Sequence, residues 1–164
     1  MGTITIRQAE TEEDVTEVRT IFREYESWLD LDLCFQRFED ELKTLPGKYS
    51  PPGGRLFLAR VDEQIAGCIA LRPLAASYCE MKRLFVRESF RGMRIGKLLI
   101  DRLIEEGRDI GYATMRLDTF PSKMGKAVRL YESYGFRKIP AYYNNPTEGV
   151  LFMELDLMTK QQAQ

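Results

Sequence analysis

Apolar and polar residues alternate along several short stretches of the chain, and this period of two is typical of β-strands. Residues 3–7 alternate strictly, and residues 55–61 and 65–71 form two apolar runs joined by a tight turn at residues 62–64. We expect this hairpin to end at Pro73. Four later stretches predict further strands, at residues 79–86, 113–119, 136–139 and 150–157.

Between these stretches the apolar residues recur three and four positions apart, as they do along one face of a helix. One such face is formed by Val15, Val18, Ile21, Phe22 and Tyr25. Thr11 and Asp14, or the acidic residues around them, predict where this first helix begins. Three more helices are predicted, over residues 35–45, from Ile95 to the stop signal Gly111, and over residues 124–134 before Gly135.

The elements follow the order β-α-α-β-β-β-α-β-α-β-β, which predicts an α/β protein: an α+β mixed sheet flanked by helices. A chain of 164 residues suits one domain with a full core, which we expect over residues 1–158. Residues 159–164 are polar and are predicted to be a tail. The loop at residues 46–54, rich in proline and glycine, is too short to separate two domains.

Composition removes several classes of function. The formal net charge is -1 at pH 7 with both signs interleaved, so we expect no nucleic-acid partner. We expect no membrane span and no signal peptide, and the three cysteines lack Cys-x-x-Cys spacing, which favours reduced thiols in a cytoplasmic protein. The chain contains no histidine, which excludes Ser-His-Asp hydrolysis and histidine-based zinc catalysis. Proton transfer must then use other side chains or water, and we expect no metal.

The stretch at residues 78–111 combines a strand, a short basic loop and a helix. The residues between strand and helix are Arg91, Gly92, Met93, Arg94, Ile95, Gly96 and Lys97. A helix start presents unpaired backbone N–H groups and a positive dipole end, so it suits a phosphate group. The spacing matches neither the P-loop nor Gly-x-Gly-x-x-Gly. Taken alone, the loop also fits an ordinary strand–turn–helix unit with surface cations.

Two motifs resemble the GNAT superfamily, the acetyl-CoA-dependent N-acyltransferases. The pyrophosphate loop of that family is Arg/Gln-x-x-Gly-x-Gly/Ala between a strand and a long helix, and Arg91, Ile95 and Gly96 fit it. Arg94 stands where the first glycine usually lies, so it must keep a negative φ or tolerate strain, unless Gly92 supplies the freedom. Residues 127–136 are similar to the family's Ala-x-x-Leu-Tyr-x-x-x-Gly-Phe.

The resemblance covers nearly the whole chain and implies a GNAT-like acyl-CoA N-acyltransferase fold with acetyl-CoA as co-substrate. It implies that the backbone of Leu84, Phe85 and Val86 pairs with the pantetheine arm, where one N–H group polarises the thioester carbonyl. It also implies that the backbone N–H groups from Arg91 to Lys97 hold the pyrophosphate.

The resemblance implies two catalytic residues, each with an alternative role. Tyr131 matches the family's general acid, which protonates the leaving thiolate, but its spacing also fits a core aromatic. Glu80 matches a glutamate that serves as general base in the histone-acetylating branch, but a surface carboxylate paired with Lys82 or Arg83 is equally consistent. Some members need no protein base. Cys79 is an alternative nucleophile for a two-step transfer, but no histidine could activate it, and a buried, inert thiol is the preferred interpretation.

The family's layout implies that the first two helices and the loop after the penultimate strand surround the acceptor. Asp118 and Thr119 are candidates for contact with either substrate, and the candidates around the acceptor are Trp28, Phe35 and Phe38 from the helices and Tyr142, Tyr143, Asn144 and Asn145 from the loop. We expect a small-molecule primary amine as the acceptor. A protein lysine or N-terminus, or a CoA-binding sensor without turnover, are the alternatives, and a homodimer is compatible with the resemblance.

Overall fold

The structure is a computed structural model, which describes residues 2–30 and 37–158. The N-terminal half holds β1 (Ile4–Gln8), α1 (Glu12–Leu29), α2 (Phe38–Thr44), the 3₁₀ helix η2 (Gly47–Tyr49), β2 (Arg55–Val61), β3 (Gln64–Ala75) and β4 (Tyr78–Val86). The remainder holds the 3₁₀ helix η3 (Glu88–Phe90), α3 (Ile95–Ile110), β5 (Thr114–Thr119), α4 (Pro121–Tyr134), β6 (Arg137–Ile139) and β7 (Leu151–Asp156). The predicted order of elements is confirmed.

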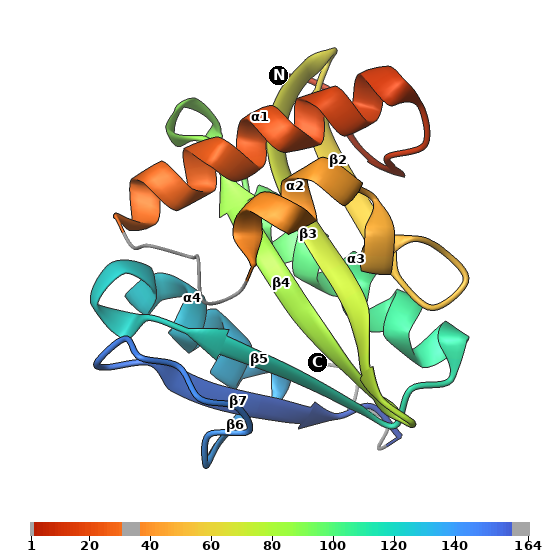
Figure 1. The fold of residues 1–164 in the computed structure, drawn as a ribbon. Helices are drawn as coiled ribbons and strands as arrows, with labels where there is room; N and C mark the ends of the chain where they lie inside the picture. The colour runs from red at the N-terminus through yellow and green to blue at the C-terminus, as the bar shows by residue number, and fades with distance from the viewer. Residues whose placement is uncertain (1, 31–36, 159–164) are drawn as a thin grey trace.

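All strands form one sheet in the order β1-β2-β3-β4-β5-β7-β6. Every neighbouring pair is antiparallel except β4 and β5, which are parallel. Helices α1 and α2 cover one face of the sheet and α3 and α4 the other (Figure 1). The predicted α/β class, a mixed sheet flanked by helices, is therefore correct. No helix within residues 2–30 and 37–158 is long and apolar enough to cross a bilayer.

Each face of the sheet has its own apolar core. Under α3 and α4, the side chains include Ile69, Leu71, Leu99 and Leu103, all fully enclosed. Under α1 and α2, the corresponding group includes Phe22, Phe38, Leu56 and Leu58. Since the hydrophobic effect favours burial on both faces, β2 and the first part of β3 are buried at nearly every position and lose the alternation seen in β1.

Local capping signals explain where the long helices begin and end. Thr11 is the N-cap of α1: its Oγ1 accepts from Asp14 N at 3.0 Å, and Asp14 Oδ2 accepts from Thr11 N at 3.3 Å, which completes a capping box. Gly111 and Gly135 end α3 and α4 in the left-handed conformation, as predicted. Helix α4 begins three residues earlier than predicted, at Pro121, with a kink at Met124, because proline is well suited to the first helical position.

Two other predicted boundaries differ from the structure. Strand β3 continues through Pro73 to Ala75, because beyond Leu71 it pairs only with β4, and a proline can stand where no second neighbour needs its N–H. The second helix begins at Phe38, not at Phe35. Phe35 and the predicted tail at residues 159–164 lie outside the described residues, so the single domain over residues 1–158 stays a prediction.

The two parallel strands separate soon after they meet. Pairing between β4 and β5 covers Tyr78 to Glu80 opposite Thr114 to Arg116, and from there the strands diverge in a V (Figure 1). Within the described residues, the second half of β4 therefore has no partner strand on its β5 side. An irregularity in the β3–β4 register coincides with a left-handed backbone at Arg83 (φ 63°), which is a β-bulge next to the opening of the V.

Candidate active site

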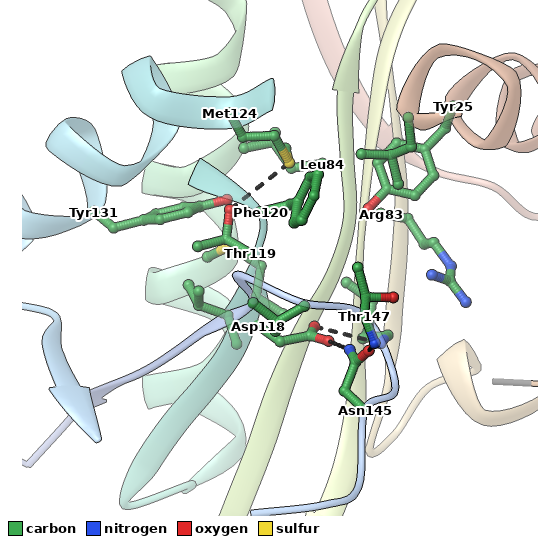
Figure 2. Close-up of a pocket in the computed structure, with 15 residues that line it drawn as sticks. Tyr25, Arg83, Leu84, Asp118, Thr119, Phe120, Met124, Tyr131, Asn145 and Thr147 are labelled. Carbon is green, nitrogen blue, oxygen red and sulfur yellow. Dashed lines mark hydrogen bonds and ion pairs between the residues drawn. The ribbon is translucent and has the colours of Figure 1, made fainter. Parts of the chain in front are cut away.

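A small cavity lies where β4 and β5 diverge. Its volume is about 50 Å3, which leaves room for a small group, since one water occupies roughly 10–15 Å3 on this measure. Tyr131 enters from α4, Tyr25 from α1, and Asp118 and Thr119 from the end of β5, while Leu84 lies on the free stretch of β4 (Figure 2). The cavity thus brings together residues that are far apart in the sequence.

The Tyr131 hydroxyl faces this cavity. The residue is 3% exposed, and its hydroxyl makes no hydrogen bond with any residue that the structure describes. Among the described residues, the only fully buried side-chain nitrogen or oxygen without a hydrogen-bond partner belongs to Arg108. The Tyr131 oxygen also lacks a partner but is not in this class, so part of its surface is accessible. Burial raises the pKa of the Tyr131 phenol above its ordinary value, so the group is protonated at neutral pH. A protonated phenol with no protein acceptor is a suitable proton donor.

A polar cluster lies beside the cavity around Asp118. Its Oδ2 accepts hydrogen bonds from the Tyr143 hydroxyl and, at 3.4 Å, from Asn145, and Lys82 Nζ lies 3.8 Å from Oδ1. Burial by itself raises the pKa of Asp118, but the Lys82 ammonium and the Tyr143 hydroxyl outweigh it, so the pKa is below its usual range. Burial lowers the pKa of Lys82, an effect that the nearby carboxylates oppose. The cluster therefore holds Asp118 as a carboxylate.

The bulge at Arg83 turns two successive cationic side chains toward the α1 and α2 side of the sheet. Arg83 forms a bidentate ion pair with Glu41 of α2 (3.0 and 2.9 Å), and its guanidinium lies 5.2 Å from the Phe38 ring centre. A left-handed non-glycine residue costs roughly 1–2 kcal/mol, so these contacts must hold the bulge in place. Lys82 and Arg83 line both the cavity and a second pocket on this face.

Glu80 lies in that second pocket rather than in the cavity. It is fully enclosed; Arg72 Nε donates to its Oε1 at 2.8 Å, and the Tyr142 hydroxyl donates to its Oε2 at 2.6 Å. Glu80 forms its ion pair with Arg72 on the neighbouring strand, whereas the alternative prediction was a surface carboxylate paired with Lys82 or Arg83. Glu80 and Tyr142 thus line the second pocket and Tyr131 lines the cavity, while Lys82 and Arg83 line both.

The basic loop before α3 offers a row of backbone donors. Within the described residues, none of the N–H groups from Gly92 to Lys97 donates a hydrogen bond to the protein. Gly92 (φ 90°) and Arg94 (φ 63°) both take the left-handed conformation. The backbone at Arg94 is therefore strained, whereas a glycine at this position would adopt the same conformation without strain. Unpaired N–H groups at the positive end of a long helix fit a pyrophosphate.

Trp28 lies nearer to this loop than to the second pocket. Its ring packs against Phe85 (5.7 Å between centres), Arg91 lies 5.2 Å from its centre, and Lys123 of α4 lies 5.8 Å from it. Arg91 Nε also donates to Val86 O at 2.9 Å, which ties the loop to the end of β4. Of the predicted acceptor residues, Tyr142 therefore lines the second pocket, whereas Trp28 connects α1 to the loop.

Comparison with known proteins agrees with this geometry. The sequence model of the Acetyltransferase (GNAT) family matches residues 15–136. The chain belongs to the GNAT family. An uncharacterised N-acetyltransferase of Schizosaccharomyces pombe is 38% identical over 94% of this chain and 95% of its own length. A GNAT acetyltransferase structure from Staphylococcus aureus superposes with a TM-score of 0.77 at 23% identity, covering 94% of this chain and 99% of that one.

Membership establishes the activity class: the protein is a GNAT N-acetyltransferase, as the two motifs implied. A solved PaiA N-acetyltransferase from Thermoplasma acidophilum in complex with coenzyme A has the same fold, with a TM-score of 0.72 at 19% identity over 94% of this chain and 99% of that one. Solved neighbours in this family thus bind CoA. Among the described residues, no group of three or more acidic or cysteine side chains is arranged to hold a metal ion.

Two predicted residues, Cys79 and Asn144, line neither the cavity nor the second pocket. Cys79 is enclosed in the core beneath α3, and burial raises the pKa of its thiol to about 12, so it is a poor nucleophile. The structure therefore favours a buried, inert thiol over a nucleophile at Cys79. Asn144 is exposed and lines none of the pockets described for the molecule, whereas its neighbour Asn145 lines the cavity.

Neither Tyr25 nor Arg72 was identified from the sequence as a candidate site residue. The sequence also did not predict that Lys82 and Arg83 line both the cavity and the second pocket. One signal was available: the run Glu80-Met81-Lys82-Arg83 places charges inside an otherwise apolar strand, where an isolated charge is costly to bury. A buried charged run of this kind indicates partners elsewhere in the fold. No pattern in the sequence identified those partners as Arg72, Asp118 and Glu41.

Proposed function

We propose that this GNAT enzyme transfers an acetyl group from acetyl-CoA to the primary amine of a small molecule by direct attack. The observation that carries the proposal is the cavity between β4 and β5, where the Tyr131 hydroxyl, without a partner among the described residues, faces the stretch of β4 that does not pair with β5. Acid catalysis and a fixed approach of two substrates are what amine acetylation by a thioester requires.

The residues that would hold acetyl-CoA follow the edge of the V. The thioester is the activated acyl group that acetyl-CoA supplies. The N–H groups from Gly92 to Lys97 hold the pyrophosphate, and the backbone of residues 84–86 pairs with the pantetheine arm as an added strand would. An N–H group of this stretch stabilises the negative charge on the carbonyl oxygen. The Tyr131 hydroxyl donates its proton to the sulfur as the carbon–sulfur bond breaks and the carbon–nitrogen bond forms.

The acceptor enters from the α2 side, through the second pocket. This pocket has a volume of about 270 Å3, just below the roughly 300–1,000 Å3 that hold drug-sized ligands. Tyr142 and Tyr143 bound it and are tied to Glu80 and Asp118 by their hydroxyls, so the loop before β7 lies across the face that an extended peptide would need. A pocket of this size supports a small amine over a protein lysine.

Glu80 stays our prediction for the base. Because both of its oxygens accept hydrogen bonds, the proton of the acceptor ammonium reaches it through the Tyr142 hydroxyl, which passes on its own proton in exchange. Glu80→Gln should then lower kcat most at low pH and least at high pH, where free amine is abundant. A kcat that is unchanged across the pH range would remove Glu80 from this role and leave water as the base.

The experiment that tests the proposal follows CoA thiol release from acetyl-CoA with a panel of small primary amines and, separately, with lysine-containing peptides. Turnover with small amines and little with peptides supports it. Faster turnover with peptides would favour a protein acetyltransferase instead. Turnover with neither, together with no thermal stabilisation by acetyl-CoA, would refute the proposal; saturating ligand at 100 times Kd should stabilise by about 2.7 kcal/mol.

A further inference from the structure

The second pocket is lined by more cationic side chains than carboxylates, and one of these cations, Lys82, forms its ion pair with Asp118 outside the lining. Its lining includes four cationic side chains, Arg37, Arg72, Lys82 and Arg83, and two carboxylates, Glu41 and Glu80. The pocket lies beside the cavity and shares Lys82 and Arg83 with it. A molecule in the pocket could therefore extend from the acetyl group outward to the arginines.

Both carboxylates in this lining are already engaged. Glu41 accepts two hydrogen bonds from Arg83, and Glu80 accepts from Arg72 and from Tyr142. Neither carboxylate is thus free to attract a second cationic group on the acceptor. The lining would instead disfavour a polyamine or any acceptor with an additional positive charge.

Two arginines retain donors that no described residue uses. Arg37, exposed at the start of α2, makes no ion pair or hydrogen bond with any residue in the described ranges. Arg72 uses Nε and Nη2 on a single oxygen of Glu80, which leaves its other amino group, Nη1, without a protein acceptor in the same ranges. The Arg72 side chain is 30% exposed, so this donor can be reached.

The two arginines also lie together. Both line the second pocket and both line the adjoining pocket between α2 and η2, where Lys48 adds a cation and Asp40 a carboxylate. The guanidinium fork matches the planar geometry of a carboxylate and can bind it in a bidentate manner. At about 270 Å3, the pocket suits a molecule about the size of an amino acid.

We infer that the acceptor is a small amine that carries a carboxylate, an amino acid in the broad sense. This inference rests on the proposed function and assigns the acceptor class to the same site. The carboxylate lies on Arg37 and Arg72, and the amine points toward the end of the pocket that Lys82 and Arg83 share with the cavity. The arginines thus select the acceptor, while the cavity performs the transfer.

The test compares amines that differ only in the carboxylate. The rate of thiol release is measured with β-alanine against propylamine and with γ-aminobutyrate against butylamine, because the free amines of each pair have similar basicity. Phosphoethanolamine is added to distinguish a carboxylate site from a phosphate site. We expect kcat/KM to be at least 10-fold higher for the amine that carries the carboxylate, since hydrogen bonds to charged groups contribute more than neutral ones.

Two variants connect this preference to the pocket. Arg37→Gln should raise KM for the carboxylate-bearing amines about 10-fold and leave the neutral amines unchanged. Arg72→Lys keeps a cation beside Glu80 but removes the fork, and should act in the same direction. Arg23→Gln is the matched control, because Arg23 is an exposed arginine on α1 that pairs with Glu39 and lines none of the described pockets.

The outcomes distinguish this inference from the proposed function. Equal or better turnover of the neutral amines would overturn the carboxylate assignment while leaving acetyl transfer to small amines intact. A preference for phosphoethanolamine, or a carboxylate preference that survives both arginine substitutions, would also overturn it. Failure to acetylate any amine would overturn the proposed function, and the inference with it.

Discussion

The Tyr131→Phe substitution separates catalysis from folding unusually well in this protein. The ring packs at 5.6 Å from Phe136 and stays in place in the variant, and the hydroxyl that is lost makes no hydrogen bond to any described residue. The folded protein therefore loses no internal hydrogen bond. We expect the free energy of unfolding to change by less than about 1 kcal/mol, or by roughly 4 °C or less in Tm for a chain of this length.

The expected loss in turnover is much larger. General acid catalysis typically contributes about 10²–10⁴-fold to a rate, so we expect kcat to fall at least about 100-fold, equivalent to about 2.7 kcal/mol in the barrier. The affinity for acetyl-CoA should stay within about 3-fold of the native value, because the loop before α3 and the free stretch of β4 are unchanged. The assay pairs steady-state thiol release with calorimetric titration of acetyl-CoA.

A matched control lies one turn further along α4. The Tyr134 hydroxyl bonds to Asp101 and, at 3.3 Å, to Lys97 O on the outer surface of the α3–α4 layer, away from the cavity. Tyr134→Phe should leave kcat nearly unchanged. If Tyr131→Phe retains more than about a third of native kcat at unchanged acetyl-CoA affinity, the proton reaches sulfur by another route and Tyr131 is only a core aromatic.

Three further substitutions test other parts of the structure. Gly96→Val should weaken acetyl-CoA binding at least about 10-fold, because a branched side chain would occupy the space where backbone meets pyrophosphate. Arg83→Met should lower stability by about 3 kcal/mol in thermal melts, since it leaves Glu41 without its ion pair and keeps the left-handed backbone. Glu106→Gln should destabilise by about 1 kcal/mol at pH 7 and much less below about pH 4, as chemical denaturation across pH would reveal.

Each of these has an internal check. The apo protein with Gly96→Val should melt near the native temperature, because a Cβ at this position meets only Val86 Cγ2, at 3.9 Å; unchanged acetyl-CoA affinity would refute the loop assignment. Adding Glu41→Gln to Arg83→Met should recover part of the loss by removing the uncompensated charge, and no recovery would contradict the ion-pair explanation.

The sign of the Glu106 effect follows from its partners. Burial by itself raises the pKa of Glu106, but hydrogen bonds from Arg55 (2.7 Å) and Arg102 (3.0 Å) outweigh it, so the folded pKa is below the ordinary value. A depressed folded pKa stabilises above the unfolded pKa of about 4.3, and that stability is lost as pH falls through the folded pKa. A difference between native and variant that persists at pH 3 would contradict this account.

Local signals in the sequence determined much of the fold. The alternation in β1, the capping box at Thr11 and the glycine stops at Gly111 and Gly135 act within a few residues, so they are readable without the tertiary structure. The order of elements and the GNAT motifs followed from such signals. Strand and helix boundaries that depend on neighbouring elements were predicted less well. Strand β3 extends past Pro73 because there it pairs with β4 on one side and needs no partner on the other.

The candidate site also has one part that the sequence could predict and another that depends on the tertiary structure. The loop at residues 91–97 was identified from sequence because backbone donors at a helix start belong to one contiguous segment. The left-handed conformation of Arg94 was not, since both signs of φ were compatible with the motif. The side chains around Tyr131 come from α1, β4, β5 and the loop before β7, so their meeting depends on the divergence of β4 from β5.

The partners of the charged run on β4 belong entirely to the tertiary structure. The sequence by itself determined that Glu80, Lys82 and Arg83 lie on a strand of a GNAT acetyltransferase. Only the fold paired Glu80 with Arg72, because antiparallel β3 places these two residues opposite each other in the register. Only the bulge turned Lys82 and Arg83 to the same face, where both line the cavity and the second pocket.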